Sequence, residues 1–290
     1  MMTIEVLIYM FLKAQAAASG TILLTLALRL PVRRLFGAEI GYHLWFLVPV
    51  AGLASLFPTV PEFGEGLPKA TSGLANGFAP FTAPVLAHAP FVALVWSAGA
   101  LGLGALFAVG QWRFDRSARA GKAGPAATGF WPRMIVPAGY AARFTPEERQ
   151  LIRAHERAHM DRRDPTSNLM IAFLQVISWF NPIAHLAATL ARMDQELSID
   201  AKVMAQHPKG RRRYAETLLK AHSHGLNSPL ACALSLGARH PLEVRLAMLG
   251  MRKISVRRDG LGVMLIGILG LALVIVLLVG APALAIYSPR

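Results

Sequence analysis

Four long apolar runs divide the chain. They cover about 4–30, 40–58, 85–110 and 261–287. Each reaches the roughly 20 residues that a helix needs to cross a bilayer, whereas buried helices of soluble proteins explain runs of only about 10–14. The last run has no charged residue, and the first holds Lys13, which must face a helix partner or water. This pattern predicts an integral membrane protein with four transmembrane helices.

The segment between the third and fourth runs is polar enough to form a separate domain. Thr145 fits the N-cap of a helix, Pro146 its first position and Glu148 the closing position of a capping box. The pair Asp164–Pro165 should end this helix. A short apolar stretch further on, 168–180, predicts either a core helix or a helix lying against the membrane. The other expected elements are an edge strand at 133–136 and helices at about 182–205 and 211–224.

Charge indicates how the chain is oriented. The chain carries a net charge of +14, and the segment 111–259 holds 24 of its 30 Lys and Arg but only 12 of its 16 acidic residues. Basic residues flank both ends of this segment, as the positive-inside rule requires of a cytoplasmic segment. We therefore expect a membrane domain at 1–110, a cytoplasmic domain at 111–259, and a fourth span with a short external tail at 260–290. Both termini would lie outside.

The same composition argues against a nucleic-acid-binding protein and against a protein stabilised by disulfide bonds. No basic–aromatic or zinc-finger pattern accompanies the positive charge, so direct nucleic-acid binding has no further support. The one cysteine, Cys232, excludes an internal disulfide bond.

The stretch RAHERAHMDRRD, residues 153–164, carries the clearest chemistry. On a helix, His155 and His159 lie one turn apart on the same face, where two imidazoles can bind one metal ion. Glu156 lies about 100° around the helix, close enough to act on a water molecule beside the metal without being a ligand. The spacing is that of a zinc peptidase; the alternative is the solvated face of a charged helix.

A third metal ligand is expected on the next long helix. Glu196 and Asp200 are four residues apart and share a face, whereas Asp194 points away. Glu196 would bind the metal, and Asp200 would accept the outer N–H of a zinc-bound histidine. The alternative is an ordinary exposed pair of carboxylates. His185, near the start of this helix, is a candidate donor to the transition state, although such a histidine more often packs or faces solvent.

Several motifs together resemble the membrane metallopeptidases of the BlaR/MecR type, peptidase family M56. The matching stretches are FWPRMIVP (130–137), HERAHMDRRD (155–164), WFNP (179–182), DQELSID (194–200) and RRRYAETLLK (211–220). The resemblance implies a zincin-like (gluzincin) domain between the third and fourth spans, with zinc as the cofactor and a location in the bacterial cytoplasmic membrane. The antibiotic sensors continue into an extracellular penicillin-binding domain, which we expect this chain to lack. Beta-lactam sensing by this chain alone is therefore unsupported.

The resemblance also implies a regulatory role. The expected activity is cleavage of a cytoplasmic protein, such as a transcriptional repressor, and of the chain itself. An extended substrate could add to the strand at 133–136. Membrane lipid, a separately encoded sensor and a second copy of the chain are the other candidate partners. Two alternatives stay open: a non-catalytic membrane transducer or scaffold, and a quality-control metallopeptidase.

Overall fold

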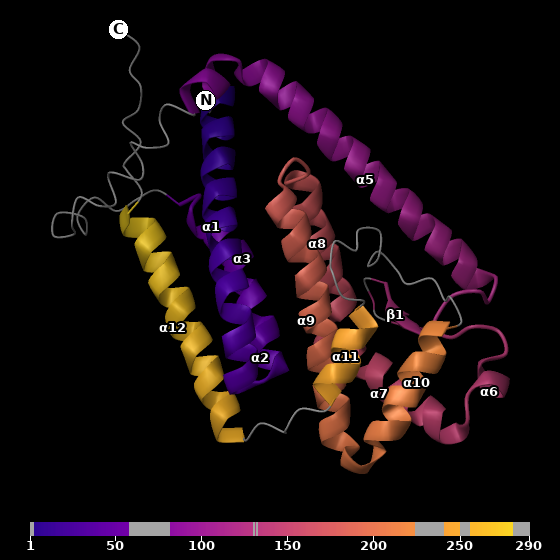
Figure 1. Ribbon diagram of the computed structural model, residues 1–290. Coiled ribbons are helices and arrows are strands. Elements are labelled where there is room, and N and C mark those ends of the chain that lie inside the picture. The colour runs from indigo at the N-terminus through magenta and orange to yellow at the C-terminus, as the bar shows by residue number, and fades with distance from the viewer. Residues whose placement is uncertain are drawn as a thin grey trace, which may run out of the picture.

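The computed structural model describes residues 3–57, 82–129, 131, 133–223, 241–249 and 256–280, and this part of the chain is mainly helical (Figure 1). A helical segment at 82–87 precedes α5. The other elements in chain order are α1 (Ile4–Phe36), α2 (Ala38–His43), the 3-10 turn η1 (Leu44–Phe46), α3 (Leu47–Ala54), α5 (Ala89–Arg119), β1 (Ala126–Thr128), β2 (Arg133–Ile135), α6 (Tyr140–Arg143), α7 (Pro146–Arg162), α8 (Asp164–Ile177), α9 (Pro182–Gln206), η3 (Pro208–Gly210), α10 (Arg211–Ser223), α11 (Pro241–Leu249) and α12 (Val256–Gly280).

Three helices in the described part of the chain are long and apolar enough to cross a membrane. They are α1, α5 and the segment Arg258–Leu278 of α12. Their outer faces carry large exposed apolar side chains, such as Leu101 and Leu271, as expected for helices surrounded by lipid. These helices correspond to the first, third and fourth apolar runs, so the chain is a membrane protein.

The second apolar run has a different structure. It forms a shorter helical stretch, Ala38–Ala54, which η1 interrupts. Ile40 and Leu44 in this stretch are completely buried, and they pack with Val32 of α1 and with apolar residues of α12. In Figure 1, α2 and α3 lie against α1. The run is apolar partly because protein covers it, and its helical length alone does not establish a fourth span.

The segment after α5 folds largely as its sequence predicts. Thr145 and Glu148 form the capping box, so α7 begins at Pro146. The predicted edge strand is present as β2, which pairs antiparallel with β1, Ala127 lying opposite Met134. The helix ends at Arg162, because Arg163 adopts a left-handed conformation that turns the chain directly into α8.

Helix α9 takes part in two separate cores. Toward its N-terminus, Ala187 and Ala191 pack with Ile22 of α1 and with Tyr42 and Trp45. The second core surrounds the C-terminal part of α9 and joins α7, α10 and α11; its buried members are Leu151, Ala158, Ile199, Val203, Tyr214 and Leu249. One helix therefore connects the membrane-spanning part to the part that carries the histidine motif.

Candidate metal centre

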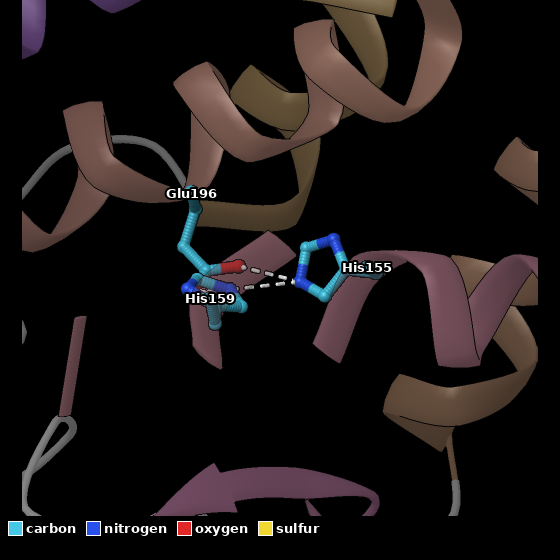
Figure 2. Close-up of side chains that lie close together, drawn as sticks. All are labelled: His155, His159 and Glu196. Carbon is cyan, nitrogen blue, oxygen red and sulfur yellow. Dashed lines mark hydrogen bonds and ion pairs between the residues drawn. The ribbon is translucent and has the colours of Figure 1, made fainter. Parts of the chain in front are cut away.

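Helices α7 and α9 bring His155, His159 and Glu196 together (Figure 2). The Nε2 atoms of the two histidines lie 3.1 Å apart. Each also lies 3.4 Å from a carboxylate oxygen of Glu196. Both histidines are 8% exposed, so the donor atoms converge in a protected site at the surface of α7 that faces α9.

Each imidazole is fixed through its other ring nitrogen. The Nδ1 atom of His155 lies 2.8 Å from the Tyr214 hydroxyl, which itself donates to Asp200 at 2.6 Å. The Nδ1 atom of His159 lies 2.6 Å from Asp164. Since these partners accept a proton from Nδ1, Nε2 is the atom of each imidazole that faces the shared space and can bind a metal ion in exchange for its proton.

Arginines neutralise the carboxylates behind the cluster. Arg245 of α11 binds Asp200 through two hydrogen bonds of 2.8 Å and reaches Glu196 at 3.0 Å. Arg162, at the end of α7, likewise forms a bidentate pair with Asp164. It also donates to Ser198 of α9 and thus ties the two ligand-bearing helices together.

These charges shift the pKa values of the cluster. Burial alone would lower the pKa of His155, but its contacts with Asp200 and Glu196 raise it. Burial acts in the same direction on His159, but Glu196 and Asp164 raise its pKa to about 10. Burial would raise the pKa of Glu196, yet Arg245 and the histidines hold it well below its usual range. The cluster is thus a compact set of carboxylates and cations, in which a metal ion can take the place of protons.

The donor set fits a divalent metal such as zinc. Two nitrogens at about 2.0 Å from a tetrahedral zinc ion are separated by about 3.3 Å, close to the distance between the two Nε2 atoms. Two histidines and one carboxylate leave a fourth position open, as in catalytic rather than structural zinc sites. The oriented imidazoles are a further property of such sites.

Glu156 lies beside the cluster and has its own anchor. Its Oε2 atom accepts a hydrogen bond of 2.7 Å from the backbone N–H of Ala127 in β1. Glu156 is 8% exposed, and its carboxylate is among the charges that raise the pKa of His159. The residue expected to act as the base is therefore held next to the histidines by the strand rather than by another side chain.

The structure brings together most of the residues singled out from the sequence. His155, His159 and Glu196 form the cluster, and Asp200 lies behind it. The Asp200 carboxylate is 3.4 Å from Nδ1 of His155, and the shorter hydrogen bonds between them run through the Tyr214 hydroxyl. His185 lies elsewhere. Its ring nitrogens contact Gln175 and the carbonyl oxygen of Trp179, about 16 Å along α9 from Glu196. The transition-state donor expected at this histidine is not brought to the cluster.

Three contributors were not singled out in the sequence for these roles. Asp164 was considered only as the end of α7 and part of a family motif, although its place five residues after His159 could have suggested an acceptor for that imidazole. The sequence presents Tyr214 only as part of the motif RRRYAETLLK. No sequence signal pointed to Arg245, because it reaches Asp200 across 45 residues.

Comparisons with known proteins point to a family of peptidases. Residues 119–249 match the family model described as "BlaR1 peptidase M56". The chain is also similar to the regulatory protein BlaR1 of Bacillus licheniformis, with 29% identity over 90 residues. This alignment covers 31% of the chain and 15% of the length of that protein. No solved structure matches the chain.

Proposed function

From the premise that residues 119–249 belong to the BlaR1-type M56 peptidases, we propose that the chain is a zinc endopeptidase of the membrane. His155, His159 and Glu196 would hold the metal, with Asp200 and Asp164 orienting the histidines. The observation that carries the proposal is the convergence of both Nε2 atoms on Glu196 while both Nδ1 atoms are engaged elsewhere.

The chain's own residues supply the proton transfers. Zinc, when bound, acts as a Lewis acid that activates water and polarises the peptide carbonyl. Glu156 takes a proton from the attacking water and passes it to the leaving amine, and the Ala127 amide keeps its carboxylate in place. Because this amide belongs to the β1–β2 sheet, we propose that an extended substrate adds to this sheet, beside β1 or beside the strand at 133–136.

We also propose a cytoplasmic location for the metal site. Basic residues at both ends of 111–259 support this orientation, with both termini outside and the stretch Ala38–Ala54 completing a fourth crossing. A domain at 111–259 then faces the cytoplasm, where a protein substrate such as a transcriptional repressor would meet it. The name of the BlaR1 relative supports a regulatory role. As parts of this proposal, the chain also cleaves itself, receives its signal from a separate sensor and forms a homodimer.

The proposal is tested by metal content and self-cleavage in detergent-purified protein. We expect one zinc per chain and cleavage in the wild type, one zinc without cleavage in Glu156→Gln, and weakened zinc binding in Glu196→Ala. Glu216→Ala removes an exposed carboxylate from α10 and serves as the matched control, which should behave as the wild type.

The outcomes separate the alternatives. Full zinc binding in Glu196→Ala would remove this residue from the ligand set. Stoichiometric zinc in wild-type protein that cleaves neither itself nor a candidate repressor would favour a non-catalytic transducer. Folded protein without zinc would reduce the histidine motif to the charged face of a helix.

A further inference from the structure

The turn between α8 and α9 lies between two membrane-spanning helices. In Figure 1, α8 and α9 run side by side, and the turn that joins them points up between α1 and α5. Trp179 in the turn donates to the backbone of Trp96 in α5 at 3.1 Å. On the opposite side, Asn181 donates to Ser19 of α1 at 2.9 Å, and the ring of Phe180 packs against Phe11.

These contacts fix how deep the turn reaches. Trp96 lies about 10 Å from the start of α5 and about 21 Å before Gly110, where the apolar run of that helix ends. Ser19 lies about 15 Å along α1 from Arg29, the first basic residue of its C-terminal part. Both contact points are therefore inside the apolar stretches of the two spans, far from their basic ends.

Close packing confirms that α5 and the turn are in direct contact. A Cβ atom added at Gly99 would collide with the Trp179 ring. Absence of a side chain at an interface is the usual way in which helices in membranes approach each other closely. The turn is thus packed against α5 within its apolar part.

The turn also satisfies its own backbone, as hydrocarbon requires. A helix end leaves carbonyl oxygens without partners, and water supplies those partners only where it is present. Here the Ile177 carbonyl accepts from the Trp96 indole at 2.9 Å, and the Trp179 carbonyl is contacted by His185 at 2.9 Å. At the start of α9, the Asn181 side chain accepts from the Ile183 amide at 3.0 Å. His185 therefore has a structural task at the turn.

The outer face of α8 is apolar and open. Leu169, Met170 and Phe173 are 49%, 54% and 57% exposed, and Phe180 in the turn is 44% exposed. Gln175, on the inner face, is buried and bonded to His185 and Arg192. Exposure of such an apolar face to water is unfavourable in free energy, whereas contact with lipid tails between α1 and α5 is not.

We propose that α8 and α9 form a re-entrant hairpin that enters the bilayer from the side of the metal cluster, with lipid acyl chains covering Leu169, Met170 and Phe173. The hairpin is about 20 Å long, so its polar ends, Asp164 and Glu196, come to lie near the membrane surface. For the function proposed above, the preferred substrate segment is then one that lies close to the membrane. The hairpin itself does not depend on that function.

Spin labels in lipid nanodiscs test the proposal. A nitroxide is attached to a single cysteine at position 173 in a Cys232→Ser background, and its collisions with oxygen and with a water-soluble nickel complex are compared. Leu101 of α5, which is 74% exposed, is the reference for lipid, and Arg212 of α10 is the reference for water. A second label at Met170 covers the case in which the Phe173 variant does not fold.

We expect oxygen collisions to exceed nickel collisions at Phe173 and Met170, as at Leu101, with the reverse at Arg212. A label at position 173 that behaves as the one at position 212 would overturn the proposal, since water would then cover α8. Shielding from both reagents would also overturn it, because protein would be the cover. The readout needs neither zinc nor cleavage, so failure here is distinct from failure of the peptidase function.

Discussion

The two ends of α9 are held by different kinds of partner. At the tip end, residues 181–189, Asn181 and His185 bond to a serine hydroxyl, an amide side chain and a backbone carbonyl. At the metal end, residues 194–203, Glu196 and Asp200 are bound by Arg245 and by the imidazole of His155. One continuous helix therefore passes from neutral hydrogen bonds to ion pairs.

This difference follows the surroundings that each end would have. A charged group in hydrocarbon costs several kcal/mol, so neutral amides and indoles are the economical way to satisfy backbone groups there. A buried carboxylate near water can be kept ionised by a paired arginine, and a metal site needs ionised ligands. The type of polar contact along α9 thus indicates where the bilayer ends.

Removing the cation at the metal end should have the largest effect. Arg245→Met removes the guanidinium that holds the buried Asp200 carboxylate through two hydrogen bonds, which we expect to cost about 3–5 kcal/mol of unfolding free energy in metal-free protein. Arg212→Met, which breaks the exposed pair with Glu216, should change stability by less than about 1 kcal/mol. Unfolding in mixed detergent measures both. Equal small losses would mean that ion pairs do not hold the metal end.

Placing a charge on α8, the other helix of the hairpin, should have the next largest effect. Phe173→Arg puts a guanidinium on the proposed lipid-facing side of α8, at a cost of about 3 kcal/mol. Leu219→Arg is the matched control on α10, where the side chain is 48% exposed, and should stay within about 0.5 kcal/mol. Thermal unfolding of both variants in nanodiscs gives the comparison. Similar values for the two would contradict a lipid-covered α8.

Replacing the carboxylate beside His159 by a neutral amide should weaken metal binding. Asp164→Asn keeps a hydrogen bond to His159 but removes the negative charge that raises the basicity of the imidazole. We expect zinc affinity to fall by about 10–100-fold, as for other partners of ligating histidines. Competition with a chelator measures the affinity, with Asp161→Asn, on the exposed side of α7, as the control. Unchanged affinity would show that Asp164 serves only Arg162.

Zinc binding should also depend on pH, because the metal displaces protons from its ligands. The pKa of both ligand histidines is raised, that of His159 to about 10, because the nearby carboxylates outweigh burial. Below that pKa the imidazole carries a proton that zinc must displace, so affinity increases with pH, about tenfold per unit for each proton released. Competition at pH 6, 7 and 8 in matched ionic strength measures the slope. A flat profile would mean that the free histidines are already neutral.

Local sequence signals predicted helix α7 well. The capping box of Thr145 and Glu148 and the turn at Asp164 need only neighbouring residues, and the four-residue spacing of His155 and His159 needs only helix geometry. Glu196 could also be predicted as a ligand, because its four-residue spacing to Asp200 places both on one face of a long helix. These features are local, so the sequence alone could indicate them.

Long-range contacts were beyond the sequence. Arg245 and Tyr214 reach Asp200 only because α10 and α11 pack beside α9, and no spacing rule predicts that packing. Hydropathy also failed to separate two environments in the second apolar run, since a side chain such as Ile40 is equally apolar whether lipid or protein covers it. The sequence makes His185 a candidate donor because it lies near Pro182, whereas its partners come from α8 and from the turn before α9.

The unbroken length of α9 has a mechanical consequence. Its 25 residues form a rod about 37 Å long that carries Glu196, while the two histidines belong to α7. A packed helix transmits an axial displacement as a rigid element, so a shift of the turn by α1 or α5 would move Glu196 relative to the two histidines. In the metal site proposed above, this shift would change the distance between Glu196 and the metal ion. Helix α9 would then couple the position of the membrane spans to the coordination of the metal.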